Sequence, residues 1–168
     1  MGTIEQMHGC MADYFSAEKT ESLIFVLVGM TAITASALLY LKAPSFRGMI
    51  IPLVLIALIQ IAVGGAVYLR TDAQVAGLSR QLDADPAACK AAEVPRMEAV
   101  MRAFTTYKLI EIALLAAGIA LTFVFRRNDF WYSMGIGLII QPSFMLVLDL
   151  LAERRGEAYL ECLKQLLA

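Results

Sequence analysis

The sequence predicts an all-α polytopic membrane protein, a four-helix transmembrane bundle with a small helical cap. Four apolar stretches cover residues 22–41, 49–69, 106–125 and 130–151, with lengths of 20, 21, 20 and 22 residues. A helix needs about 20 residues to cross the hydrocarbon core of a bilayer. Backbone groups in lipid must be bonded within their own segment, and no stretch alternates with the period of two of a lipid-facing barrel strand. We therefore expect four helices.

The length and composition indicate one transmembrane domain, residues 1–168. With 60% hydrophobic residues and a mean hydropathy of +0.69, the 168-residue chain has little polar sequence outside the four spans. That remainder comprises the N-terminal segment, a helical connection over about residues 71–105 and an amphipathic C-terminal helix over about residues 153–168. An even number of spans places these three parts on one side of the membrane. We expect them to form the cap.

The segment before the first span is not typical of a cleaved signal peptide. It carries four acidic residues against one lysine, and the span that follows is 20 residues long, so we expect this span to be retained. Met11 is a plausible alternative start, and on that interpretation His8 and Cys10 are dispensable. The segment also carries an apolar helical stripe that suits the membrane interface, formed by Ile4, Met7, Met11, Tyr14 and Phe15.

The central connection and the C-terminal tail are both predicted to be helical. Asp85 followed by Pro86 is typical of an N-cap and a first helical residue, and we expect Pro95 to restart the helix that enters the third span. Gly156 is the expected joint between the fourth span and the tail. The apolar positions of the two segments are Val75, Leu78 and Leu82 in the connection and Tyr159, Leu160, Leu163 and Leu167 in the tail.

Two ionisable residues lie inside predicted spans, Glu111 and Asp149. Each costs roughly 2–3 kcal/mol to insert even on a lenient scale, so each calls for a partner or a purpose. If spans three and four pack antiparallel, the two carboxyl groups lie at similar depths and can meet. Structural ion pairing is the first interpretation, Glu111 with Lys108, and Asp149 with Arg70, Arg154 or a neighbouring cap residue. Proton or cation handling by the carboxyl pair and recognition of a ligand are the alternatives.

Two amides, Gln60 and Gln141, fall near the middle of spans two and four. A hydrogen bond between them would fix the register of the two helices, contributing about 0.6–2 kcal/mol. The alternative is a polar lining for a cavity. Pro142 favours that alternative, because it frees a backbone carbonyl one turn earlier and invites a kink.

The three cysteines are widely spaced and form no CxxC pair, so neither a redox motif nor a thiolate metal site is indicated. We expect free thiols, with a bridge between Cys89 and Cys162 as the alternative. His8 is the one histidine of the sequence, which argues against bis-histidine haem, a histidine-rich zinc site and a Ser/His/Asp triad. We therefore expect no catalytic residues, no metal ligands and no cofactor. The net charge of −1 also argues against nucleic-acid partners.

The orientation follows from the positive charges beside the spans. The two short turns carry Lys42, Arg47, Arg126 and Arg127 against one acid, Asp129. The opposite side has more cations in total, but also more acids and far more chain. Counting favours termini inside, whereas the density of cations in the short turns favours termini outside. We adopt termini outside, in a bacterial plasma (inner) membrane.

The function that these observations favour is that of a small non-catalytic integral membrane protein. It would act as an interaction or accessory protein in the lipid bilayer, recognising a membrane protein or a toxin as immunity proteins do. The competing class is a small oligomeric transporter or channel, in which Glu111 and Asp149 handle a proton or cation. The candidate partner-binding residues lie at the charged rim of the cap: Arg70, Glu93, Arg96, Lys108 and Arg154.

Overall fold

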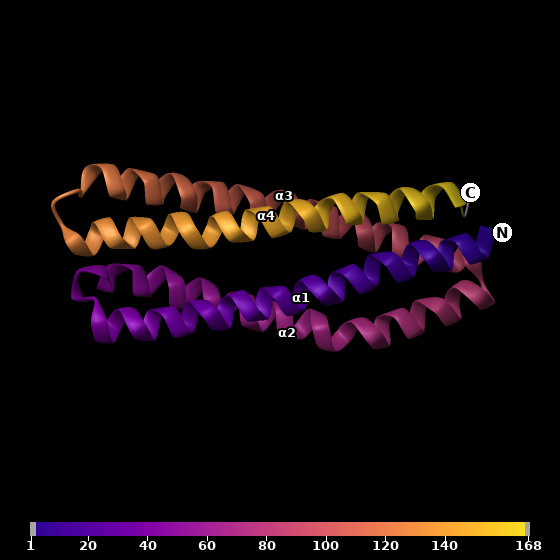
Figure 1. The fold of residues 1–168 in the computed structure, drawn as a ribbon. Helices are drawn as coiled ribbons and strands as arrows, with labels where there is room; N and C mark the ends of the chain where they lie inside the picture. Colours follow the sequence, from indigo (N-terminus) through magenta and orange to yellow (C-terminus); the bar gives the residue numbers. More distant parts are fainter. Residues whose placement is uncertain (1–2, 167–168) are drawn as a thin grey trace.

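The computed structural model describes residues 3–166 and confirms the all-α class (Figure 1). Its four long helices are α1 (Thr3–Lys42), α2 (Arg47–Ala84), α3 (Pro86–Val124) and α4 (Asp129–Leu166), with a single 3-10 turn, η1 (Pro44–Phe46), between α1 and α2. Leu167 of the predicted apolar tail stripe lies outside the described residues, as does Ala168.

All four helices are long and apolar enough to cross a membrane. They contain 38 to 40 residues and, at about 1.5 Å per residue, each is roughly 60 Å long, about twice the thickness of a hydrocarbon core. Each helix therefore continues beyond the core without a break. We call the end that holds both termini and the α2–α3 turn the cap, residues 3–21, 71–104 and 153–166, and it matches the predicted helical cap.

The helices form two antiparallel hairpins, α1 with α2 and α3 with α4 (Figure 1). The hairpins meet chiefly through α2 and α4, with a smaller contact between α1 and α4. Because both hairpins begin or end at the cap, the first and last residues of the described chain lie close together there. This arrangement brings residues from opposite ends of the sequence into one small volume.

Glycines allow the helices to approach closely. A Cβ atom added to Gly118 would lie 2.8 Å from the carbonyl oxygen of Gly135, and one added to Gly135 would lie 2.7 Å from that of Gly118. Across the other hairpin, a Cβ added to Gly64 would lie 2.7 Å from the carbonyl oxygen of Ser22. Close backbone approach through small residues is the usual basis of helix packing in lipid.

The turn between α2 and α3 is as predicted, but two other predicted breaks are wrong. Asp85 caps α3 by accepting a 3.0 Å hydrogen bond from the backbone N–H of Ala88, and Pro86 is the first helical residue. Pro95 does not restart a helix; α3 passes through it, and its exposed position lets water reach the freed carbonyl. Gly156 is not a joint either, because α4 is continuous there. The absence of a side chain at Gly156 lets α4 pack closely against Met101 of α3.

The N-terminal segment is an integral part of the cap. His8 bonds Asp83 of α2 at 2.8 Å, and Met7 and Met11 are almost completely buried. The suggestion that the residues before Met11 are dispensable is therefore wrong for the folded cap. The buried apolar cluster of the cap draws on all four helices: Met7, Met11, Tyr14, Phe15, Leu82, Cys89, Met97, Tyr159 and Leu163.

Candidate functional site

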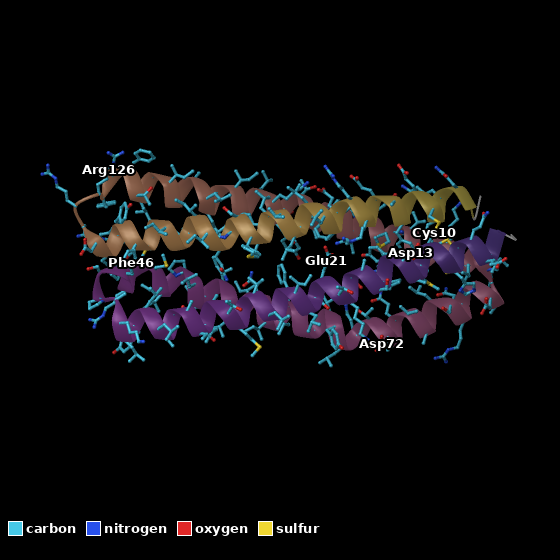
Figure 2. All side chains as sticks on the ribbon, viewed as in Figure 1. Cys10, Asp13, Glu21, Phe46, Asp72 and Arg126 are labelled. Atoms are coloured by element: carbon cyan, nitrogen blue, oxygen red, sulfur yellow. A yellow bond between two sulfur atoms is a disulfide. The ribbon has the colours of Figure 1, made fainter. Side chains whose placement is uncertain are left out.

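A disulfide joins the two ends of the described chain. Cys10 of α1 and Cys162 of α4 are bonded, with their Cα atoms 6.6 Å apart and a sequence separation of 152. The expectation of free thiols is therefore wrong for Cys10 and Cys162, as is the alternative of a Cys89–Cys162 bridge, whereas Cys89 keeps a free thiol as expected. No spacing rule links positions this distant, and only the packing of α1 against α4 brings them together. Figure 2 shows Cys10 at the cap, far from Phe46 and Arg126 at the opposite end.

The third cysteine, Cys89, is buried in the cap cluster and is the free thiol of the described residues. Burial raises the pKa of its thiol. Because the thiolate is the reactive species in thiol–disulfide exchange, this environment disfavours attack on a neighbouring disulfide. Cys89 therefore behaves as a packing residue.

A buried polar cluster lies beside that thiol. Glu93 is only 2% exposed, and its carboxylate accepts hydrogen bonds of 2.5 and 2.6 Å from Arg96 and one of 3.2 Å from the Tyr159 hydroxyl. Burial, followed by the charge of Glu93, raises the pKa of Tyr159, so its hydroxyl remains a donor. Glu93 was predicted to lie on the partner-binding rim; it lies in the core instead, because three donors compensate its charge.

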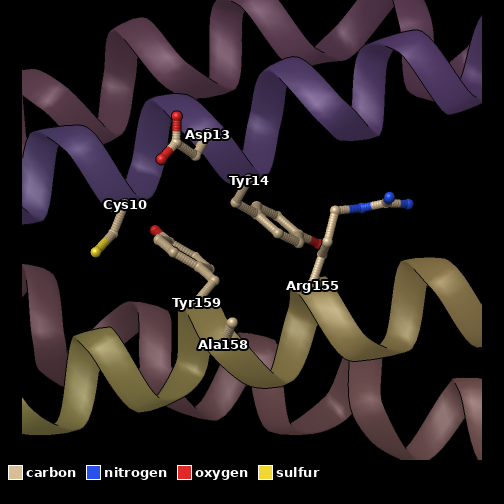
Figure 3. A pocket seen from close by; sticks show the side chains of 6 residues that line it. All are labelled: Cys10, Asp13, Tyr14, Arg155, Ala158 and Tyr159. Atoms are coloured by element: carbon tan, nitrogen blue, oxygen red, sulfur yellow. The ribbon is translucent and has the colours of Figure 1, made fainter.

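A shallow hollow of about 190 Å³ opens between α1 and α4 next to the disulfide (Figure 3). The ring of Tyr14 stacks on that of Tyr159, with centroids 4.7 Å apart and an angle of 8° between the planes. Arg155 lies beside the stack and also contacts Glu21 of α1. The lining residues are Cys10, Asp13, Tyr14, Arg155, Ala158 and Tyr159.

Several ion pairs in and beside the cap join neighbouring helices. Arg70 of α2 lies 3.8 Å from Glu18 of α1, and Lys164 of α4 lies 2.8 Å from Glu98 of α3. Of the predicted rim residues, Arg70 and Arg96 are thus engaged within the cap, whereas Arg154 is exposed on α4. Further contacts of this kind join Lys19 to Asp72 and Arg155 to Glu21. These pairs hold neighbouring helices in register.

The acidic pair lies where α3 and α4 leave the cap. Glu111 is 2% exposed, and among the described residues no hydrogen-bond donor reaches either of its carboxylate oxygens. Its interacting neighbour is the carboxyl group of Asp149. The predicted Lys108–Glu111 pair is wrong, because the Lys108 ammonium contacts both oxygens of Glu153, at 2.5 and 2.6 Å. Asp149 does not pair with Arg70 or Arg154 either; the charged groups acting on it are Glu111, Glu153 and Lys108.

The two amides meet as expected. Gln141 Nε2 donates a 2.8 Å hydrogen bond to Gln60 Oε1, and both side chains are buried. The amide nitrogen of Gln60, Nε2, has no hydrogen-bond partner among the described residues. The bond connects α2 to α4, the two helices that join the hairpins, so it fixes the register between them.

Comparison with known proteins gives no relative. No family model, no curated protein and no solved structure matches the chain.

Proposed function

We propose that this chain is a non-catalytic membrane protein that acts through its cap, as an interaction or accessory protein of a bacterial plasma membrane. One observation carries the proposal. All four helices extend past the length that a bilayer requires and are tied together there by a disulfide and by ion pairs between neighbouring helices. A protein that served only as a membrane anchor would not need a cross-linked cap outside the bilayer.

The construction of the cap suits recognition. A surface that is already ordered loses little conformational entropy when it binds, so more of the contact energy appears as affinity. The exposed side of the cap combines Arg154 and Glu157 of α4 with the hollow beside Tyr14 and Tyr159. A surface that carries both charge signs suits a membrane-protein or toxin partner better than a nucleic acid or an anionic lipid.

The disulfide supports an outward-facing cap. Structural disulfides persist in oxidising compartments, which lie outside the plasma membrane of a bacterium. The concentration of cations at the opposite end, in Lys42, Arg47, Arg126 and Arg127, favours the same orientation. Both observations support the proposed orientation, with the termini outside.

Labelling with a membrane-impermeant maleimide tests this orientation. In a Cys89→Ser background, Glu157→Cys places a thiol on the exposed cap side of α4, and Ser45→Cys places one in the exposed turn at the opposite end. We expect Glu157→Cys to be labelled in intact cells and Ser45→Cys only after permeabilisation. The reverse pattern would contradict an outward-facing cap.

A second candidate function, a small oligomeric transporter or channel, is favoured by the buried Glu111 beside Asp149. Liposomes containing the purified protein, with a fluorescent reporter of proton or cation flux, separate the two functions. The accessory proposal expects no flux from wild type, Glu111→Gln or Asp149→Asn. Flux in wild type that both folded variants abolish would overturn the accessory proposal in favour of transport.

A further inference from the structure

The register of α3 against α4 places two carboxyl groups face to face. Lys108 of α3 contacts Glu153 of α4 at 2.5 and 2.6 Å, and the two helices run antiparallel. One turn further from the cap on each helix are Glu111, three residues after Lys108, and Asp149, four residues before Glu153. Residues at these spacings share a helix face, so the two acids are brought together by the same contact that joins Lys108 to Glu153.

The environment of Glu111 does not compensate a negative charge. The residue is 2% exposed, and neither carboxylate oxygen has a hydrogen-bond donor among the described residues. Lys108, the nearest cation along α3, is held by Glu153. Two ionised carboxylates would then face each other in a setting that penalises each of them by several kcal/mol.

We propose that Glu111 and Asp149 form a proton-binding site in which the two carboxyl groups share a single proton. The proton makes one carboxyl group a donor and leaves the other as its acceptor. A single O–H···O hydrogen bond then supplies the partner that Glu111 otherwise lacks and reduces the charge of the pair from two negative to one. Because the shared proton neutralises one of the two charges, the pair needs no basic residue of its own.

A proton fits this site better than a metal ion. Two carboxyl groups supply all that a shared proton requires, one donor and one acceptor. Calcium, by contrast, takes about 6–8 oxygen ligands, and most of them would have to come from groups other than these two carboxylates. Among the residues that the structure describes, no cluster of three or more potential metal ligands includes either acid.

The charged groups nearest the site all lie on its cap side. On α3 and α4 these groups are Lys108 and Glu153, one turn nearer the cap. The charged residues that flank the spans on the cap side of α1 and α2 all form ion pairs: Glu18 with Arg70, Lys19 with Asp72, and Glu21 with Arg155 of α4. We infer that the proton exchanges with the cap side, past the Lys108–Glu153 pair. The inference does not depend on the accessory function proposed above.

Infrared spectroscopy of the full protein in lipid nanodiscs tests the site directly. A protonated carboxyl group has a carbonyl stretching band that is separate from the bands of ionised carboxylates. Wild type should show this band at neutral pH and lose it reversibly when the pH is raised. Absence of the band from folded wild type at neutral pH would overturn the proposal without any variant.

Matched variants assign the band. Glu111→Gln and Asp149→Asn each remove one carboxyl group and offer an amide donor to the other, so we expect both to lose the band. Glu157→Gln changes an exposed glutamate of α4 and should retain it. A band unchanged in both Glu111→Gln and Asp149→Asn, or displaced in wild type by adding Na⁺ or Ca²⁺ at constant pH, would contradict a shared proton. Flux measurements are not needed, so failure here is distinguishable from failure of the accessory function.

Discussion

Replacing the Cys10–Cys162 disulfide should destabilise the cap by an amount that can be worked out from its place in the chain. The double variant Cys10→Ser/Cys162→Ser removes a link between residues 152 positions apart. In the chain-entropy account, opening a loop of this size costs about 5 kcal/mol of stability at room temperature. That figure is a ceiling, because membrane insertion already restricts the unfolded chain.

We therefore expect a loss of about 2–4 kcal/mol, the range typical of a native disulfide. For a chain of this length, such a loss corresponds to a fall in melting temperature of about 5–15 °C. The remaining cap contacts, including the Lys164–Glu98 pair at 2.8 Å, should keep the helices themselves formed. The effect should thus appear in thermal stability and not in helical content.

The assay is thermal unfolding in detergent, with and without a reducing agent, together with a count of free thiols in denaturant. Wild type should show one free thiol per chain, Cys89, and a melting temperature that reduction lowers to that of the double variant. Reduction should leave the double variant unchanged. Three free thiols in wild type protein purified from cells, or equal melting temperatures with and without reductant, would contradict a stabilising Cys10–Cys162 disulfide.

Three further predictions concern packing, the amide pair and pH. Gly118→Ala should lower the free energy of unfolding by about 1–3 kcal/mol, because its Cβ would lie 2.8 Å from a backbone oxygen of α4. A Cβ at Gly65 would have no neighbour within 4 Å among the described residues, so Gly65→Ala should be neutral in the same unfolding assay. Gln141→Leu should cost about 1–3 kcal/mol by leaving the Gln60 amide buried and unpaired, and adding Gln60→Leu should recover much of that loss. Burial raises the pKa of Glu18 above its ordinary 4.5, so the folded state holds this proton to a higher pH than the unfolded state does. Stability should therefore fall as the pH rises from 4.5 through the folded pKa, and Glu18→Gln should flatten that part of the profile; an unchanged profile would contradict the assignment.

The helices were predictable because their signals are local. Each apolar stretch has the length of a membrane span, and the Asp85-Pro86 pair marks the start of α3 within the sequence itself. The contact between Gln60 and Gln141 was also predictable, because both lie near the middle of their spans and polar side chains at that depth form hydrogen bonds between helices.

The cap contacts were not predictable because they depend on which faces of the helices meet. The pairing of Cys10 with Cys162, and of Lys108 with Glu153 instead of Glu111, follows from the rotation of α1 and α3 against α4. Sequence spacing along one helix does not determine that rotation. Pro95 and Gly156 were misleading for a related reason: residues that break helices in isolation are tolerated where solvent or close packing compensates them.

Site-specific photo-crosslinking in intact cells tests whether the cap is the end of the molecule that recognises a partner. A photoreactive amino acid at the position of Arg154 samples the exposed cap, and one at the position of Arg127 is the matched control at the opposite end. We expect a discrete adduct of defined mass from position 154 and none from position 127. Adducts from position 127 alone would contradict the claim, as would their absence from position 154 and from further exposed cap positions.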